Sequence, residues 1–178
     1  HLRTRRQRQM CIRDRPELDP ILLDSAKNFP AVADGKIYLA VKMLDREGGV
    51  RYGLVEVPSE RLDRFVQVPQ KKGRQGKVFT VLEDIILNSL PEVFRGVIDI
   101  AQAEGYVFKL TRDAELELGE GINQSLIDKV AQSIKKRQSG EPERFVYDSE
   151  MPQDLLDLLI KRLKLTKYDS MMPGGRYH

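Results

Sequence analysis

The sequence is poor in the residues that most catalytic and metal sites require. Histidine occurs only as His1 and His178, one at each end of the chain, and Cys11 is the single cysteine. This excludes a Ser-His-Asp arrangement and acid–base catalysis by histidine. It also excludes an internal disulfide and the usual His/Cys metal sites. Most catalytic templates therefore fail on this sequence.

Long apolar runs and nucleotide-binding loops are also missing. No apolar run reaches the about 18 residues needed to cross a bilayer as a helix, and no segment has the layout of a secretory signal. We therefore expect a cytoplasmic protein without a membrane span. There is no GxxxxGK[ST] phosphate loop, and Gly119-Glu120-Gly121 lacks the third glycine of a dinucleotide-binding motif. That segment is better explained as a loop before a helix.

What the chain does contain suffices for one ordinary globular domain. Of its 178 residues, 40% are hydrophobic and 32% are charged, which is enough for a real core. The net charge of +3 is unevenly distributed, because residues 1–15 hold six arginines and one aspartate, a local charge of +5. Residues 16–178 therefore carry a net charge of −2. The sequence pI of about 8.9 thus says nothing about the partners of the body.

Residues 1–15 have the composition of a basic arm, which could bind nucleic acid. The run Met10-Cys11-Ile12-Arg13-Asp14-Arg15, however, resembles one reading frame of a transposase adaptor used in sequencing libraries. We therefore expect residues 1–15, with the only cysteine, to be a non-native, disordered arm that precedes a body formed by residues 16–178. No nucleic-acid binding by the body is expected.

Strand patterns dominate the first half of the body. In residues 37–43 the apolar positions Ile37, Leu39, Val41 and Met43 fall on one face of an extended chain. A turn at residues 45–49 and a second strand at residues 52–57 complete a predicted β-hairpin.

A third strand is predicted at residues 64–68, followed by a loop at residues 70–76 and extended structure at residues 77–79. Thr80 and Glu83 have the spacing of a capping box. We expect a helix from there to about Leu90, with Ile85 and Ile86 inward, ending before Pro91.

The second half mixes strands and helices. Residues 97–111 predict one or two strands, broken or bulged near Gly105, and residues 144–147 predict another. Helices are expected over residues 123–138 and from Pro152 onward, the latter burying Leu155, Leu158, Leu159 and Leu163. The tail, residues 168–178, is expected to be a loop. The pattern predicts an α+β fold, a single domain with a mainly antiparallel sheet and about three helices packed on it.

Two charged clusters are candidate sites, and each has a simpler explanation. Asp113, Glu115 and Glu117 alternate along an extended stretch, so they share one face and could form a metal or acid–base cluster. A solvated strand edge is the more common origin of such a row and is the explanation we favour. The cations around the predicted loop can hold a phosphate chain by charge, or can simply make a hairpin loop soluble. They are Lys71, Lys72, Arg74 and Lys77.

Four stretches of the body resemble polyphosphate kinases. They are Lys109–Glu115 (KLTRDAE), Arg137 with Gly140–Tyr147 (GEPERFVY), Tyr168–His178 (YDSMMPGGRYH) and, more weakly, Tyr38–Val41. They occur in the order and spacing of that family and cover residues 16–178. The body is therefore similar to the middle, or head, domain of the family.

The resemblance implies a function for a longer parent protein. Family members reversibly transfer the terminal phosphate of ATP to polyphosphate through a phosphohistidine, with Mg²⁺, and their nucleotide-binding and catalytic residues belong to the domains on either side of the head. We expect this chain to be an inactive section of such an enzyme, truncated before its catalytic C-terminal domains, that provides scaffold, dimer contact and tunnel wall. No residue here matches a catalytic, cofactor-binding or metal-binding position, and His178 is not the phosphoacceptor.

Four residues are expected at interfaces or domain connections. Arg112 and Asp113 could pair across an interface, although a buried ion pair between a strand and a helix is the simpler explanation. Arg176 and Tyr177 are expected to position the chain that enters the next domain, within a tail that is disordered in this truncated form. The expected partners are the other domains of the parent, a second copy of the parent, and polyphosphate. The alternatives are a stand-alone module for polyanions or nucleic acid, and a small enzyme built on the row of carboxylates.

Overall fold

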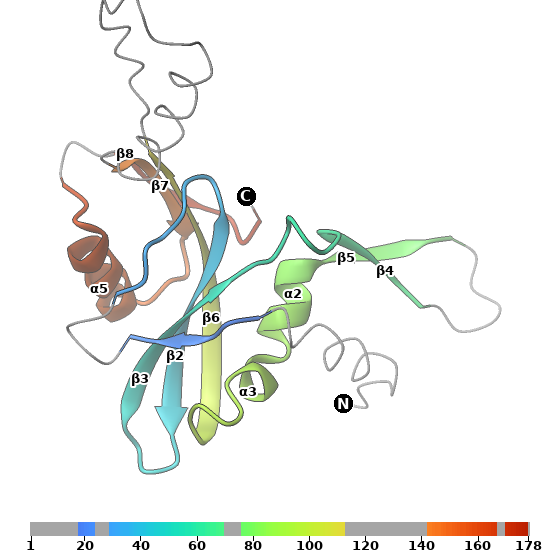
Figure 1. The fold of residues 1–178 in the computed structure, drawn as a ribbon, viewed down its shortest axis with the longest axis horizontal. Coiled ribbons are helices and arrows are strands. Elements are labelled where there is room, and N and C mark those ends of the chain that lie inside the picture. Colours follow the sequence, from blue (N-terminus) through green and yellow to red (C-terminus); the bar gives the residue numbers. More distant parts are fainter. Residues whose placement is uncertain (1–17, 24–28, 70–75, 113–141, 167–169, 178) are drawn as a thin grey trace, which may run out of the picture. The chain divides into compact units, whose positions relative to one another are not determined.

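The computed structural model describes residues 18–23, 29–69, 76–112, 142–166 and 170–177. The chain divides into two compact units (Figure 1). The first contains residues 1–29 and 37–107, and the second contains residues 30–36 and 108–178. Within the described parts, the mainly antiparallel α+β class is confirmed, with three helices.

The first unit is built on an antiparallel sheet. Strand β2 (Ile37–Asp45) pairs with β3 (Val50–Glu56) from Tyr38 opposite Glu56 to Leu44 opposite Val50, which confirms the predicted hairpin. Strand β1 (Ile21–Leu22) pairs with β3 on its other side. In the strand order β2 is followed by β6 (Ile100–Arg112), of which residues 100–107 belong to this unit.

The core of the first unit lies between this sheet and two short helices, α2 (Leu82–Leu87) and α3 (Leu90–Val93). The predicted inward face of β2 is buried, and so are Tyr38 and Ala40 on its opposite face. A strand buried on both faces needs more apolar positions than simple alternation supplies. The cluster around β2 joins residues of four elements, Leu39 and Val41 with Ile86, Leu90 and Val107.

The helical segment differs from its prediction in three ways. The capping box is wrong, because Val81 is the N-cap residue of α2 and no side chain caps it. Thr80 belongs to a strand, and the Glu83 carboxylate binds Arg64 instead. Ile86 is buried, whereas Ile85 is only half-buried. Helix α2 ends at Leu87, three residues before the predicted end. Pro91 does not interrupt helical structure, because it lies in the first turn of α3, where the missing N–H costs nothing.

A separate two-stranded sheet follows β3 along the chain. Strand β4 (Phe65–Val68) pairs with β5 (Val78–Val81), with Phe65 opposite Val81 and Val68 opposite Val78. The predicted strand at residues 64–68 is thus confirmed. Figure 1 shows this hairpin as a ribbon that extends away from α2.

Strand β6 is continuous through Gly105, so the predicted break there is wrong. A Cβ atom at this position would lie 2.5 Å from Leu87 Cδ2, which means that the glycine allows α2 to approach the strand closely. The register of β6 with β7 shifts between Thr111 and Arg112.

In the second unit, residues 108–112 of β6 pair antiparallel with β7 (Pro142–Asp148), and β7 pairs in parallel with β8 (Ser170–Gly174). Phe145 lies between two aromatic neighbours, with ring centroids 5.5 Å from Phe108 and 5.4 Å from Tyr147. The expectation of a disordered loop from residue 168 onward is therefore wrong for residues 170–174, which form a strand.

Helix α5 (Gln153–Leu163) completes the second unit. Its N-cap is Pro152, so the predicted start is nearly correct. The helix buries Leu155, Leu156, Leu159 and Leu163, whereas Leu158, predicted inward, is half-buried. The predicted helix at residues 123–138 lies outside the described residues. None of the described helices is long and apolar enough to cross a membrane.

Candidate functional site

The structure describes part of each predicted contact site. Lys71, Lys72, Arg74 and Asp113 lie outside the described residues, as does the whole row Asp113, Glu115 and Glu117. Lys77, Arg112, Arg176 and Tyr177 are described. The candidate sites that remain are therefore the β4–β5 hairpin in the first unit and the strand ends near Arg112 and Tyr177 in the second.

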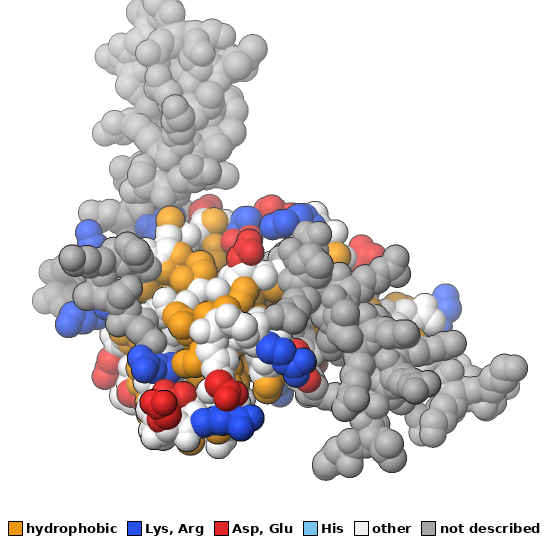
Figure 2. Space-filling view, turned by 60° about the horizontal axis from the view of Figure 1, so that its bottom comes forward, with side chains coloured by type: hydrophobic (Ala, Val, Ile, Leu, Met, Phe, Trp, Pro, Cys, Tyr) orange, Lys and Arg blue, Asp and Glu red, His pale blue; other side chains and the backbone are white. Residues whose placement is uncertain are grey.

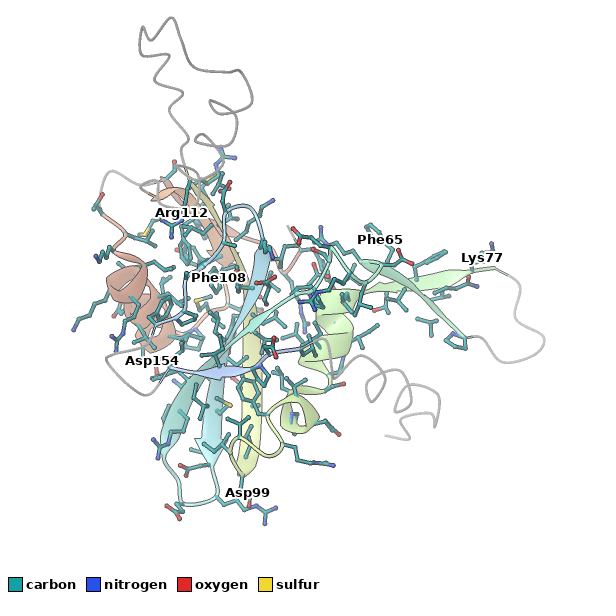
Figure 3. All side chains as sticks on the ribbon, in the orientation of Figure 1. Phe65, Lys77, Asp99, Phe108, Arg112 and Asp154 are labelled. Carbon is teal, nitrogen blue, oxygen red and sulfur yellow. The ribbon has the colours of Figure 1, made fainter. Side chains whose placement is uncertain are left out.

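Lys77 lies directly before β5, near the far end of the β4–β5 hairpin, while Phe65 lies nearer to α2 (Figure 3). The Lys77 side chain is exposed. Between residues 65 and 81 the sequence holds four cations and no carboxylate. The remaining residues of 16–178 therefore carry −6. An anionic ligand or an acidic protein surface matches the charge of this segment.

An ion pair fixes the base of the hairpin to α2. Nε and Nη2 of Arg64 lie 2.8 and 2.7 Å from Glu83 Oε1. The Leu82 N–H also donates to the Arg64 carbonyl at 2.8 Å. Glu83 is buried in the first turn of α2, so its charge requires this partner. The pair holds the hairpin in a defined direction relative to α2.

Arg112 ends β6 at the bulge. Its backbone N–H donates to Asp34 Oδ1 at 2.7 Å, and the Gly35 N–H donates to the Leu110 carbonyl at 2.9 Å. These bonds attach residues 30–36 to the strand end within the second unit. The sequence analysis missed Asp34, which gives no local signal because Arg112 follows it by 78 positions.

Arg176 and Tyr177 follow β8 after Gly175 and are exposed. The strand before them is held at its end, since the Ser149 N–H donates to the Gly174 carbonyl at 3.1 Å. Apart from its two chain neighbours, no described residue has an atom within 4 Å of the place where a Cβ of residue 175 would be.

The described surface offers no obvious catalytic arrangement. Among the described residues, no group of three His, Cys, Asp or Glu side chains could hold a metal ion. One apolar crevice in the first unit has about 290 Å³ of empty space, open solvent included, and Ser89 is the one polar residue among those that line it. Figure 2 shows a face on which hydrophobic side chains gather in the middle, with separate acidic and basic side chains around them and no continuous patch of either charge.

Known proteins resemble this chain over nearly its whole length. The family model described as the polyphosphate kinase middle domain matches residues 14–178. The polyphosphate kinase of Vibrio parahaemolyticus is 40% identical over 164 residues, and that of Escherichia coli is 37% identical over 165 residues. Each match covers 92% of this chain but only 23% and 24% of the respective relative.

The fold has a counterpart among solved structures. The crystal structure of polyphosphate kinase from Porphyromonas gingivalis superposes with a TM-score of 0.69 at 24% identity. The alignment covers 99% of this chain and 24% of that one, so the chain spans about a quarter of its relatives. Since the family model covers residues 14–178, the chain belongs to the polyphosphate kinase family, in which it corresponds to the middle domain.

Proposed function

We propose that the chain works as the middle domain of a cytoplasmic polyphosphate kinase, which transfers the terminal phosphate of ATP reversibly to polyphosphate through a phosphohistidine. The observation that carries this proposal is the 40% identity to a polyphosphate kinase over 92% of the chain. ATP and Mg²⁺ belong to other parts of the parent in this proposal.

The role proposed for this domain is to give scaffold, dimer contact and tunnel wall. Exposed apolar side chains on two elements support a contact role, Phe65 and Phe79 on the hairpin and Met171 and Met172 on β8. Arg112, Asp113, Arg176 and Tyr177 are proposed to connect domains or subunits. Lys71, Lys72, Arg74 and Lys77 are proposed to contact the passing polyphosphate weakly.

A stand-alone module that binds polyanions is the second candidate. The specific observation in its favour is the absence of any carboxylate between residues 65 and 81, beside four cations. Such a module would bind polyphosphate tightly without other domains, with an affinity that falls steeply as salt rises.

The two candidates are separated by measuring ATP-dependent polyphosphate synthesis and polyphosphate binding. We expect no synthesis by the 178-residue chain and activity when both flanking regions of the parent are joined to it. Synthesis by the chain alone would refute the proposal.

In the joined enzyme, Lys77→Ala should raise the KM for polyphosphate. Lys161→Ala, on the exposed side of α5, is the matched control and should leave the KM unchanged. Tight polyphosphate binding by the chain without the arm of residues 1–15 would favour the stand-alone module.

A further inference from the structure

Arg64 attaches the second strand of the β4–β5 hairpin to α2. Strand β5 runs directly into α2, so the chain itself attaches that strand. Strand β4 follows Arg64, whose side chain binds Glu83 in the first turn of α2 and whose carbonyl accepts the Leu82 N–H. A ribbon attached through one strand can tilt, whereas attachment of both strands fixes its direction.

Apolar packing contributes little to this attachment. The four residues of β4 and the four residues of β5 are exposed or half-buried, and none of them is buried. A two-stranded hairpin without a covered face is at best marginally stable in water. The direction of the hairpin therefore depends on the polar contacts at its base.

The Arg64–Glu83 pair is better suited to fixing a direction than to stabilising the fold. Nε and Nη2 of Arg64 both lie on one oxygen of Glu83, Oε1, at 2.8 and 2.7 Å, a short and directional arrangement. The other oxygen, Oε2, is buried and has no hydrogen-bond partner among the described residues. The Glu83 side chain is 1% exposed, so the pair carries a desolvation cost that two apolar side chains would not.

The hairpin amplifies any change of direction at its base. Lys77 lies four positions before Val81, the last residue of β5. This separation corresponds to about 13 Å along an extended strand. Lys77 lies near the far end of the hairpin (Figure 3), so a small tilt at the base displaces it more than any residue near α2.

We propose that Arg64 and Glu83 are positioning residues, whose ion pair aims the hairpin and holds Lys77 at a fixed place relative to α2. Neither residue touches a substrate, and both act through the hairpin. The inference rests on the proposed function, in which Lys77 contacts polyphosphate. It adds the buried pair that determines where this contact is made.

The direction of the hairpin is measured by the distance between two spin labels in the 178-residue chain. The labels are attached to Lys77→Cys and Arg95→Cys, with Cys11→Ser to leave no other thiol. Lys77 and Arg95 are both exposed and belong to the first unit. Labelled chain is mixed with an excess of unlabelled chain, so that pulsed electron paramagnetic resonance reports distances within one copy.

The double variant Arg64→Met/Glu83→Met removes the buried pair. The matched control, Arg46→Met/Asp99→Met, removes an ion pair of the same unit whose side chains are 73% exposed. We expect the distance distribution of the double variant to broaden by about 5 Å or more, because the hairpin arm is about 13 Å long. The distribution of the control should match that of the natural chain.

The melting temperature separates a positioning role from a merely structural one. Replacing a buried ion pair by apolar side chains is often neutral or stabilising, so Arg64→Met/Glu83→Met should keep or raise the melting temperature while its distance distribution broadens. If this variant does not fold, Glu83→Gln takes its place with the same expectation, because it keeps the shape of the side chain and removes the charge. A folded variant with the distance distribution of the natural chain overturns the inference.

Enzyme kinetics of the joined enzyme give the second readout. The double variant should raise the KM for polyphosphate about threefold or more at unchanged kcat, because a loss of binding that is equal in the ground state and the transition state raises KM alone. The control pair should leave both constants unchanged. A broadened distribution with an unchanged KM refutes the proposed contact of Lys77 with polyphosphate and leaves the positioning of the hairpin intact. A raised KM with an unchanged distribution refutes the inference and leaves the proposed function intact.

Discussion

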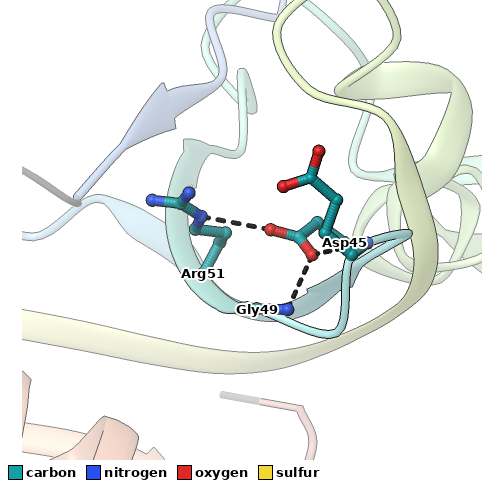
Figure 4. Close-up of polar contacts among 4 residues, drawn as sticks. Asp45, Gly49 and Arg51 are labelled. Carbon is teal, nitrogen blue, oxygen red and sulfur yellow. Dashed lines mark hydrogen bonds and ion pairs between the residues drawn. The ribbon is translucent and has the colours of Figure 1, made fainter.

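The carboxylate of Asp45 closes the turn between β2 and β3 (Figure 4). Its Oδ1 accepts hydrogen bonds from the N–H groups of Gly49 at 2.7 Å and Glu47 at 3.0 Å. Its Oδ2 lies 3.4 Å from Arg51 Nε. The Gly49 N–H, helped by Arg51 and Glu47 against the opposing effect of desolvation, holds the pKa of Asp45 below its ordinary 3.8.

This lowered pKa predicts a pH dependence. A carboxyl with a depressed folded-state pKa stabilises the fold above its unfolded pKa, and this contribution is lost as the pH falls through the folded value. Asp45→Asn should therefore lower the free energy of unfolding at neutral pH, and the difference from the natural chain should shrink below about pH 4. Urea unfolding over a pH series measures it.

Asp99→Asn is the control for Asp45→Asn. Asp99 and Arg46 form an ion pair 3.1 Å long whose side chains are 73% exposed, so we expect almost no effect at any pH. A difference for Asp45→Asn that stays constant into strong acid would contradict the assigned role of the charge.

Gly53 in β3 is required by close packing. A Cβ atom there would lie 2.6 Å from Phe94 Cζ and 2.9 Å from Met43 Cε. Phe94 is fully buried and cannot move aside without disturbing the core. We expect Gly53→Ala to destabilise the chain by about 1–3 kcal/mol.

Equilibrium unfolding in urea measures this loss. Gly175→Ala serves as the matched control, because the added methyl meets no described residue within 4 Å apart from its two chain neighbours. The control should change stability by less than about 0.5 kcal/mol. Equal free energies of unfolding for the two variants would show that the close contact with Phe94 does not destabilise Gly53→Ala.

At the scale of elements, helix α5 ends in a strained residue. Lys164 is the C-cap with φ 57°, the single non-glycine residue at positive φ in the described parts of the chain. A non-glycine residue in the left-handed conformation costs about 1–2 kcal/mol of folding free energy. Glycine avoids this cost, but it offsets part of the gain because its unfolded state has more conformational entropy. Lys164→Gly should therefore raise the free energy of unfolding by about 0.5–1 kcal/mol.

Lys161→Gly is the opposite case in the same helix. Lys161 lies in the last turn of α5 and is exposed, so glycine there should cost about 1 kcal/mol. Thermal unfolding of both variants gives the comparison. A melting temperature that falls for both would mean that the left-handed conformation of Lys164 carries no cost.

Elements with local signals were predicted well from the sequence. The β2–β3 hairpin follows from alternation and a turn cluster, and α5 follows from a leucine stripe. The errors come from partners that are distant in sequence. Glu83 has the spacing of a capping residue, but Arg64, 19 positions earlier, takes its carboxylate. Strand β8 has the composition of a loop, and it pairs in parallel with β7, whose residues lie more than 20 positions earlier in the sequence.

The candidate sites could be predicted only in part, for the same reason. Lys77 was found by its charge and Arg112 by resemblance to the family. The exposure of Phe65 and Phe79 could not be foreseen, because alternating apolar residues have the same pattern on a covered and on an uncovered strand. Asp34 was missed because its bond to the Arg112 N–H depends on the folded strand end.

At the scale of the whole molecule, charge is the property that misleads most. The net charge of +3 suggests a basic protein, yet residues 1–15 alone carry +5 and residues 16–178 carry −2. Deleting residues 1–15 should therefore abolish salt-sensitive retention on heparin and on single-stranded DNA, since a body of −2 repels polyanions. The melting temperature should not change, because the match to the family model begins only at residue 14.

Replacing the six arginines of residues 1–15 by glutamine in the full-length chain is the matched control for this deletion. It keeps the length and removes the charge, so both variants should lose the dependence of retention on salt to the same extent. Retention that survives in both would place the polyanion contact on the hairpin cations instead. Adding Lys77→Ala to the chain without residues 1–15 would then weaken its retention further. That result would mean that the middle domain binds polyanions without its neighbouring domains.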